Sequence, residues 1–478
     1  MSGGDAGAEP LDGLSGPEVQ IASKARFQAG PYGVVVILMA ATVLSFLDRT
    51  ILGLIVDPIR HDLRIGDAQI GLLSGFAFAL FYAFLGLPFG RWADRHNRQS
   101  LIVFGVAMWS VATAACGLAH TFTSLFVARV FVGVGEAALG PAALSLVANL
   151  FPKHKLGFAL ALLATGITLG NGFSVTLGGA LVAWTETKSV VLPFIGLLSG
   201  WRLVFLAVGA SGLPLAALIA LLVREPPRQT SAAAPSLSAV FAHMYAHAKT
   251  YILIISGYSF MVVMSFAQII WGPTFFLRVL HMTLVSFAVY YGLLMGVGGT
   301  LGLIAGGKIS DYLTRRGVPG APARVNLTAI IVQTPFLIVG YLSRDLAMAL
   351  LCFGVGVIVL TFTGGLQSAT LQRITPPRML GSVSAIYLIF ANLVGGGAGP
   401  FFIGALSQHL GASGNGLGQS LAVTSIITLP IAAWLVLWAL KPLAQSERAV
   451  EIAADKLPLE GRLLPADAPT GAFVGDIA

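Results

Sequence analysis

The sequence is poor in charge and in cysteine. Asp, Glu, Lys and Arg make up only 10% of its 478 residues, whereas a typical soluble domain has roughly 25%. Because 56% of the residues are hydrophobic, this shortage of charge excludes a soluble enzyme. The two cysteines, Cys116 and Cys352, both lie inside apolar runs. Their placement excludes a disulfide framework, a zinc ribbon and a CxxC redox site, and we interpret both as core residues.

Motifs for catalysis and for nucleotide binding are absent. The sequence has no HExxH, GxSxG or Walker A pattern, so we expect no enzymatic activity, no cofactor and no metal site. His243 and His247 are spaced i and i+4 with no carboxylate or thiol nearby, and we expect them to be solvated. The net charge of +8 does not indicate a nucleic-acid partner, because the basic residues lie in short loops and form no basic patch or stripe.

Long apolar runs are what the sequence does have. A run of about 20 residues is long enough to cross a bilayer as a helix. We place twelve such runs at 32–56, 68–91, 99–118, 121–149, 156–184, 202–223, 251–277, 284–310, 323–342, 346–370, 379–408 and 418–440. The prediction is an all-α integral membrane protein with twelve transmembrane helices.

The distribution of basic residues predicts an orientation. Most of the 28 Lys and Arg residues fall in the tails and in the loops on the same side as the tails. Basic residues accumulate in cytoplasmic loops, so we expect both termini in the cytoplasm and the protein in the cell inner membrane. Residues 1–30 are rich in Gly, Ala and acids, and we interpret them as a tail and not as a signal peptide.

The chain divides into two halves with a linker and two tails. We expect a disordered tail at 1–30, a six-helix bundle at 31–223, a linker at 224–250, a second six-helix bundle at 251–440 and a disordered tail at 441–478. Within the linker, residues 236–249 place apolar side chains at helical spacing, with Ser236 available as the N-cap. This pattern predicts an amphipathic helix on the inner membrane face.

One loop motif occurs twice. A shift of 217 residues superposes Gly90 on Gly307, Asp94 on Asp311 and Arg98 on Arg315. Three matches at a single offset, at the ends of the second and the eighth run, indicate duplication. Parallel six-helix repeats are a recurring transporter architecture, with the substrate site between the repeats near mid-membrane. The two bundles should therefore be pseudo-symmetric.

The motifs resemble those of a known family. The Gly-xxx-Asp-Arg-xx-Arg pattern formed by Gly90, Asp94, Arg95 and Arg98 is similar to motif A of the major facilitator superfamily, although Asn97 stands where that motif usually has glycine. Two further patterns resemble those of the spinster-like branch: Asp48-Arg49 in the first run, and Arg129-xxx-Gly-x-Gly-Glu136 followed by Ala in the fourth. The resemblance implies alternating-access transport of amphipathic lipids such as sphingosine phosphate or lysophospholipids.

Four ionisable groups lie well inside the predicted spans: Asp48, Arg49, Arg129 and Glu136. Each costs about 2.5–3.5 kcal/mol at a helix centre on insertion scales, so an intramembrane ion indicates function by default. Asp48 and Arg129 should lie at similar depth and meet, and Glu136 shares a face with Arg129 two turns away. Asp48 and Arg49 point about 100° apart. The alternative is a structural lock between two helices, with Arg49 extending outward to the interface.

The charge is confined to one half. Under the 217-residue shift, the counterparts of Asp48, Arg129 and Glu136 are uncharged: Ser265, Leu346 and Phe353. A proton-coupling site need occur only once, whereas a structural lock would more naturally occur in both halves. We therefore expect a pocket that is charged on one side and apolar or aromatic on the other, a shape that suits an amphipathic solute.

The sequence predicts a monomeric, proton-coupled secondary transporter of lipid-like solutes, surrounded by membrane lipids. Asp48, Arg49, Arg129 and Glu136 are the predicted sites of proton coupling and substrate binding, with Glu136 as the main proton carrier because arginine cannot deprotonate. The predicted conformational gate comprises Gly90, Asp94, Arg95, Arg98, Gly307, Asp311 and Arg315. The alternatives are an amphipathic drug exporter, a passive scramblase or channel with structural ions, and, more remotely, a membrane-embedded enzyme. Orientation alone could also explain the basic loops of the gate motif.

Overall fold

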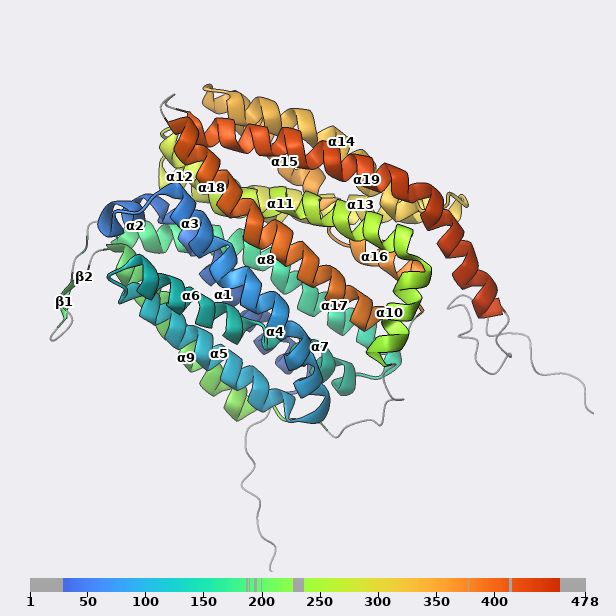
Figure 1. Cartoon of the computed structure of the whole chain (residues 1–478). Coiled ribbons are helices and arrows are strands. Elements are labelled where there is room, and N and C mark those ends of the chain that lie inside the picture. Colours follow the sequence, from blue (N-terminus) through green and yellow to red (C-terminus); the bar gives the residue numbers. More distant parts are fainter. Residues whose placement is uncertain are drawn as a thin grey trace, which may run out of the picture.

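The computed structural model describes residues 29–185, 188, 190–192, 196–198, 200–226, 236–376, 378–411 and 415–455. These ranges contain twelve apolar helices or helix pairs long enough to cross a membrane, so the predicted number of spans is confirmed. Figure 1 shows the N-terminal half in blue to green alongside the C-terminal half in yellow to red. Residues 1–28 and 456–478, where both tails were predicted to be disordered, lie outside the described ranges.

The N-terminal half supplies the first six spans. Its elements are α1 (Pro31–Leu54), α2 (Val56–Leu63), α3 (Asp67–Ser74), α4 (Phe76–Arg95), α5 (Arg98–Gly117), α6 (Phe122–Glu136), α7 (Leu139–Leu150), α8 (Lys153–Thr185), β1 (Val190–Leu192), β2 (Gly196–Leu198) and α9 (Gly200–Leu222). The two strands form a short antiparallel hairpin in the loop before α9, with Val190 opposite Leu198. All spans are helical.

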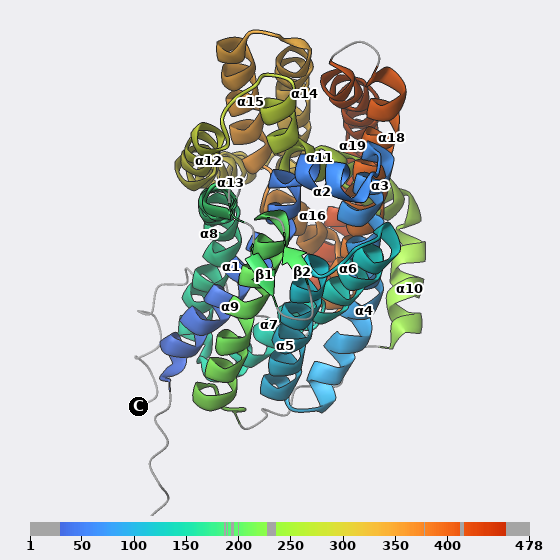
Figure 2. The same ribbon diagram turned by 90° about the vertical axis from the view of Figure 1, so that its left-hand side faces the viewer.

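The C-terminal half follows a linker helix, α10 (Leu237–Ala246). Its elements are α11 (Ala248–Arg278), α12 (Leu284–Leu293), the π-helix η1 (Leu294–Gly299), α13 (Thr300–Arg315), α14 (Ala321–Leu342), α15 (Leu346–Thr361), α16 (Leu366–Ile374), α17 (Leu380–Phe390), the π-helix η2 (Ala391–Ala398), α18 (Gly399–Leu410) and α19 (Gly416–Asp455). Viewed from the end that carries α2 and the hairpin, the two halves form separate bundles, one above the other (Figure 2).

The residue offset between matching helices of the two halves is not constant along the chain. α1 and α11 begin 217 residues apart, as do α3 and α12, but α6 and α15 begin 224 residues apart. A single shift of 217 is therefore wrong for the fourth span of each half. Counted from the helix starts, Arg129 corresponds to Phe353, each being the eighth residue of its helix, and not to Leu346. The extra residues lie in the second and third spans of the C-terminal half, which are longer than their N-terminal counterparts, and in the longer connection before α14.

The halves meet tightly at the end of the molecule that carries α2, which we call the α2 end. A Cβ added to Gly75, in the break between α3 and α4, would lie 2.5 Å from the carbonyl oxygen of Gly397 in η2. A Cβ on Gly53 of α1 would lie 2.8 Å from the Ile270 carbonyl oxygen of α11. Only glycine lets backbones approach this closely. At the opposite end, which we call the basic end, Gly307 has no other part of the chain within 4 Å of an added Cβ.

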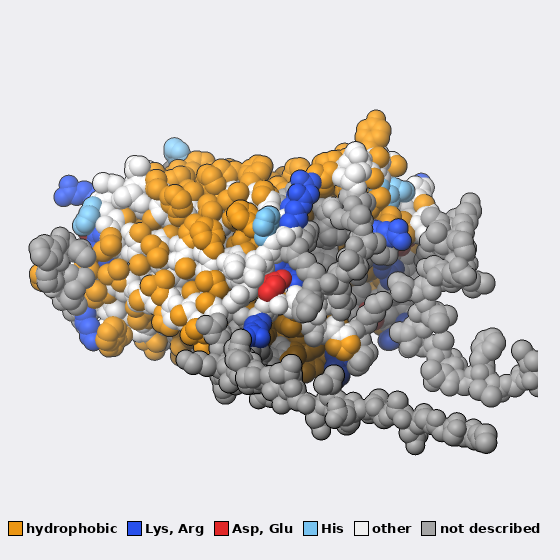
Figure 3. Space-filling view, turned by 90° about the horizontal axis from the view of Figure 1, so that it is seen from below, with side chains coloured by type: hydrophobic (Ala, Val, Ile, Leu, Met, Phe, Trp, Pro, Cys, Tyr) orange, Lys and Arg blue, Asp and Glu red, His pale blue; other side chains and the backbone are white. Residues whose placement is uncertain are grey.

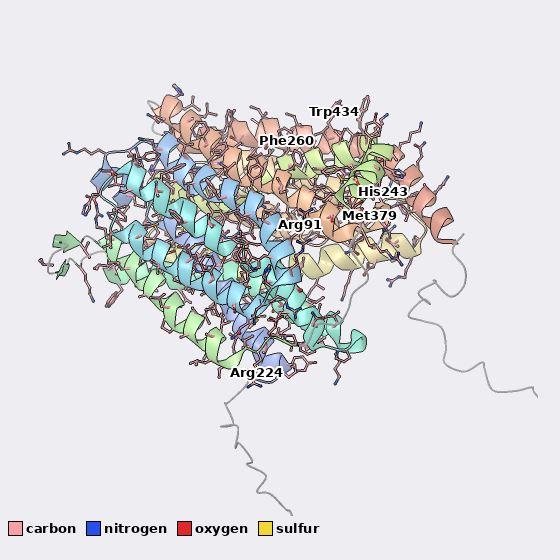
Figure 4. The ribbon with its side chains drawn as sticks, turned by 60° about the horizontal axis from the view of Figure 1, so that its bottom comes forward. Arg91, Arg224, His243, Phe260, Met379 and Trp434 are labelled. Carbon is pink, nitrogen blue, oxygen red and sulfur yellow. The ribbon has the colours of Figure 1, made fainter. Side chains whose placement is uncertain are left out.

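The surface matches a bilayer setting. In the view from below, hydrophobic side chains cover most of the left part of the face, between basic groups at its left margin and others that begin near the middle of the view (Figure 3). Trp434 of α19 is 54% exposed and projects from the outer surface (Figure 4). Apolar side chains at this level of exposure are expected where lipid, not water, is the solvent.

Two predictions at the basic end need correction. The boundary at residue 440 is too early, because α19 continues to Asp455, stabilised by Ser446 and Glu447, which bond to other elements of the C-terminal half. His243 and His247 are half-buried and bonded, not fully solvated: His243 Nε2 lies 3.1 Å from both the Tyr251 hydroxyl and the Ile374 carbonyl oxygen, and His247 Nδ1 lies 3.1 Å from Ser446 Oγ. The predicted Ser236 cap of α10 is present.

Candidate functional site

The predicted ionisable residues form two ion pairs inside the N-terminal half. Arg129 of α6 lies 3.6 Å from Asp48 of α1, and Arg49 of α1 lies 2.6 Å from Glu136 of α6. Both pairs join the same two helices. The side chains of Asp48, Arg129 and Glu136 are at most 2% exposed, whereas that of Arg49 is 19% exposed. The structure therefore brings all four residues together and leaves one cation accessible.

Arg49 is paired with Glu136, a partner that neither interpretation of the sequence assigned to it. Arg49 does not extend outward to the interface; its Nε and one terminal nitrogen donate to a single oxygen of Glu136, at 2.7 and 2.6 Å. Ser45, one turn earlier on α1, donates to the same oxygen at 2.5 Å. The successive residues Asp48 and Arg49 thus serve different partners, as their roughly 100° separation requires. Ser45 carried no sequence signal beyond its spacing from Arg49.

Glycines on α6 explain the spacing of its motif. A Cβ on Gly133 would lie 2.6 Å from the carbonyl oxygen of Phe78 on α4, and a Cβ on Gly135 would lie 2.7 Å from the backbone nitrogen of Trp109 on α5. Each glycine thus admits one neighbouring helix. Close approach on both sides keeps the interval between Arg129 and Glu136 narrow, dry and fully enclosed.

Aromatic rings surround the accessible arginine. The Cζ of Arg49 lies 4.6 Å from the centroid of Phe78, 4.7 Å from that of Tyr82 and 5.3 Å from that of Phe46. A guanidinium at this distance from a ring face is attracted by about 0.5–2 kcal/mol per ring. The rings therefore hold Arg49 in the site even where it is partly exposed. Sequence reasoning did not find Phe78 or Tyr82.

The corresponding depth of the C-terminal half contains rings and no ions. Phe353, the counterpart of Arg129, packs 5.1 Å from Phe276 and 6.1 Å from Tyr291, centroid to centroid. Ser265 stands at the position of Asp48, the eighteenth residue of α11 and of α1 respectively. The expected contrast between a charged and an aromatic half is therefore present in the two cores.

The N-terminal copy of the predicted gate motif is anchored within its own half. Arg98 is 1% exposed, and its guanidinium lies 2.6 Å from Glu225, which follows α9. The same carboxylate accepts the backbone N–H groups of Arg98 and Gln99 at 2.8 and 3.2 Å. Arg95 is exposed, and Gly90 has only Pro141 nearby. The side chain of Asp94 lies outside the described part of the structure.

The C-terminal copy is arranged differently. Gly307, Asp311 and Arg315 all lie on α13, and the side chains of Asp311 and Arg315 are exposed. The acid at the end of the last span, Glu447, bonds instead to the backbone N–H of Gly320 at 3.0 Å and lies 3.6 Å from Arg373. Figure 4 shows His243 and Met379, which precedes α17, near each other at this end of the C-terminal half.

A further cluster of ion pairs closes the α2 end, where the two halves meet. Arg278, at the end of α11, lies 2.6 Å from Asp57 of α2 and 2.9 Å from Asp67 of α3. Arg60 lies 3.0 Å from Asp67, and Ser407 of α18 donates to Asp67 at 2.9 Å. These contacts tie acids of the N-terminal half to the C-terminal half.

The described acids, histidines and cysteines form no metal-binding cluster. Within the ranges that the structure describes, no three His, Cys, Asp or Glu side chains are grouped in a way that could hold a metal ion. His243 and His247 have ring centroids 5.0 Å apart, and their bonded partners are hydroxyl and carbonyl groups. These bonds attach α10 to the neighbouring helices of the C-terminal half.

Comparison with known proteins agrees with this architecture. The family model of the Major Facilitator Superfamily matches residues 38–400. An MFS-type efflux pump of Mycolicibacterium smegmatis is 29% identical over 83% of this chain and 90% of its own length. Human protein spinster homolog 1 is 27% identical over 79% of this chain and 73% of its own length.

A solved structure extends the comparison. A bacterial homolog of the human lysosomal transporter spinster, crystallised in an inward-facing and occupied conformation, is 27% identical, covers 87% of this chain and 99% of its own, and superposes with a TM-score of 0.77. Fold, motifs and span number all point to the same assignment. This chain belongs to the Major Facilitator Superfamily of secondary transporters and is similar to the spinster proteins within it.

Proposed function

We propose that the protein is a proton-coupled, alternating-access transporter of amphipathic, lipid-like solutes that acts as a monomer in the cell inner membrane with both termini in the cytoplasm. The observation that carries the proposal is the pair of ion bridges, Asp48–Arg129 and Arg49–Glu136, buried side by side in one half. The equivalent depth of the other half is aromatic. Charge inside a membrane span is kept where it serves a transport step.

Proton coupling follows from the chemistry of the two bridges. Arginine stays charged, so only the acids bind and release protons. Glu136 accepts hydrogen bonds from Arg49 and Ser45. If an anionic group takes Arg49, the carboxylate loses its cation in a dry interior and binds a proton more readily. Substrate and proton would then load together, with Glu136 as the main carrier.

The substrate class follows from what surrounds the accessible cation. Sequence reasoning placed the headgroup at Arg129, but Arg129 is enclosed and Arg49 is the exposed member. An anionic or zwitterionic headgroup would bind at Arg49, beside Tyr82 and Phe46. The apolar chain would then lie against the uncharged C-terminal half. A sphingoid phosphate or a lysolipid has this division of polarity.

Alternating access is supported by the unequal ends of the molecule. The α2 end is closed by Arg278 with Asp57 and Asp67, while Gly307 at the basic end has open space around it. Under the positive-inside rule the basic end faces the cytoplasm, so this conformation would be open inward. The motif residues at the basic end, Gly90, Asp94, Arg95, Arg98, Gly307, Asp311 and Arg315, would close that end when the α2 end opens.

Uptake by proteoliposomes tests proton coupling. Radiolabelled sphingosine phosphate is offered with and without an imposed pH gradient, and the parent protein should accumulate it only with the gradient. Glu136→Gln should bind the lipid yet fail to respond to the gradient. Glu447→Gln is the matched control, because Glu447 is also ion-paired and only 9% exposed but lies at the helix end. Accumulation by Glu136→Gln equal to that of the parent would make Asp48 the candidate carrier.

The same assay separates a passive path from a transporter. A scramblase or channel equilibrates the lipid across the bilayer but cannot concentrate it, whatever gradient is imposed. Equilibration without accumulation in the parent protein would therefore reject proton-coupled transport. The ion bridges would then be structural.

Competition binding tests the substrate class. Unlabelled lysophosphatidic acid should displace the bound lipid, whereas a sugar acid of equal charge should not, because it lacks an apolar chain. A cationic amphipathic drug is the third competitor, since the aligned mycobacterial relative is an efflux pump. Stronger displacement by the drug than by the lysolipid would favour drug export over lipid transport.

A further inference from the structure

One aromatic ring lies between the two buried arginines. The Phe78 centroid is 4.6 Å from the Cζ of Arg49 and 5.7 Å from the Cζ of Arg129. Phe78 is only 3% exposed and belongs to α4, whereas the arginines belong to α1 and α6. The ring also stacks on Tyr82 of its own helix, with centroids 5.3 Å apart. Phe78 is thus part of the ion cluster although it carries no charge.

The ring between the two arginines affects how firmly each arginine stays with its acid. Two guanidinium groups repel each other strongly in a dry interior, and the negative face of an aromatic ring attracts both. With the ring in place, Arg49 remains with Glu136 and Arg129 remains with Asp48. An aliphatic side chain of similar size would fill the space but would attract neither cation.

The backbone of Phe78 is fixed against the arginine helix. Its carbonyl oxygen is the atom that a Cβ on Gly133 would meet at 2.6 Å, and Gly133 lies between Arg129 and Glu136 on α6. No side chain separates the two backbones. A shift of the first turn of α4 along α6 therefore moves the ring relative to both arginines.

The same turn of α4 touches the other half of the protein. α3 ends at Ser74, α4 begins at Phe76, and Gly75 between them has φ −98° and ψ −88°. A Cβ on Gly75 would lie 2.5 Å from the Gly397 carbonyl oxygen and 2.8 Å from that of Gly396, both in η2. Three residues of chain thus connect the contact between the halves to the ring between the arginines.

We propose that Phe78 is a positioning residue that couples separation of the halves at Gly75 to the release of Arg49 from Glu136. When η2 leaves Gly75, the first turn of α4 is free to move, and the ring leaves the space between Arg49 and Arg129. Without the ring between them, repulsion between the two guanidinium groups drives Arg49, the accessible cation, away from Glu136, and this carboxylate is then free to bind a proton. The inference rests on the proposed function, because it assumes that these acids carry the proton.

The ionisable groups in contact with the ring are Arg49 of α1, Arg129 of α6 and Tyr82 of α4. The acids paired with the two arginines are Glu136 and Asp48. Phe78 itself does not titrate. A change in pH dependence on replacing it would therefore act through these neighbours.

The test compares two transport modes of radiolabelled sphingosine phosphate, which is offered from outside to proteoliposomes of the same preparation. Accumulation requires the pH gradient, while counterflow exchanges labelled for unlabelled lipid without one. Phe78→Leu should reduce accumulation about tenfold, flatten its pH profile and leave counterflow near the parent's rate. Phe78→Tyr keeps the ring and should restore accumulation. Phe89→Leu, on the same helix and 9% exposed, is the matched control and should change neither mode.

Each contrary result has a definite meaning. Accumulation by Phe78→Leu at the parent's level overturns the inference, as does equal loss of both modes or failure of Phe78→Tyr to restore accumulation. A parent protein that shows counterflow without accumulation overturns the proposed function instead, and with it the premise of the inference. A thermal unfolding scan of each variant identifies any that has failed to fold.

Discussion

At matched positions the cores of the two halves have opposite chemistry. Arg129, the eighth residue of α6, is paired with Asp48, whereas Phe353, the eighth residue of α15, lies in a cluster of rings. The backbone arrangement was duplicated but the charge was kept in one copy only. Ions inside a membrane are costly to retain, so the half that keeps them is the one expected to perform coupling, while the aromatic half provides a stable apolar wall.

The largest expected difference comes from breaking each core in turn. Arg129→Ala leaves two buried acids with one cation and should cost about 3–5 kcal/mol of stability along with all transport. Phe353→Leu keeps an apolar side chain at the matched position and should cost about 1.5 kcal/mol with transport retained. Denaturation in detergent and proteoliposome uptake measure the two effects. Equal transport loss in both variants would show that coupling is not confined to one half.

The duplicated loop motif provides the second comparison. Arg98 is buried against Glu225, whereas its counterpart Arg315 is exposed. Arg98→Ala should therefore cost about 1.5–3 kcal/mol through lost charge-assisted hydrogen bonds, and Arg315→Ala should change stability by about 0.5 kcal/mol or less. Thermal unfolding of the two purified variants checks the difference. Similar losses would mean that both copies are anchored.

The α2 end reverses the asymmetry, because there the C-terminal half supplies the cation. Arg278→Ala removes the bridge to Asp57 and Asp67, which is partly exposed and worth about 1 kcal/mol. The population open at the α2 end should rise about fivefold, as measured by distances between spin labels placed across that end. Arg344→Ala, an exposed arginine between α14 and α15, is the control and should leave the distances unchanged. An unchanged distribution in Arg278→Ala would show that the bridge does not hold the closed state.

The smallest expected effect concerns α10, which packs against α11 and α17 of the C-terminal half. Partial burial and the neighbouring His243 lower the pKa of His247 from its ordinary value of 6.5. Released α10 therefore binds the proton more readily than docked α10, so docking is complete above about pH 6.5 and weakens as the pH falls below it. The protection factors of the α10 amides, which remove the dependence of base-catalysed exchange on pH, should be lower at pH 5.5 than at pH 7.5. His247→Gln should abolish that difference, and a pH effect that persists in this variant would exclude His247 as its source.

The spans could be predicted because each depends only on its own composition. Apolar runs of sufficient length locate twelve helices, and Ser236 marks the start of α10. The end of α19 could not be predicted in this way, because residues 441–455 are polar and their helix is held by contacts of Ser446 and Glu447 with distant elements. The 217-residue shift failed for α15 because the second and third spans, and the connection between them, are longer in the C-terminal half than in the N-terminal half.

The ionisable residues of the site could be predicted from the sequence, but which residue pairs with which could not. The cost of buried charge identifies Asp48, Arg49, Arg129 and Glu136 from sequence alone. The partner of Arg49 depends on how closely α4 and α6 approach, which the glycines decide only once the fold is formed. Phe78 is one of 29 phenylalanines in the sequence, and its spacing does not distinguish it from the others.

The contacts of Gly53 and Gly75 across the halves have an electrical consequence. An energised membrane holds a voltage that any continuous file of water would discharge. The backbones at Gly75 and Gly397 approach so closely that a single added carbon would overlap the carbonyl, which leaves no width for such a file between them. The glycine contacts are therefore expected to help insulate the membrane, and the Arg278 bridge is expected to act as a latch that sets how long the insulated state lasts.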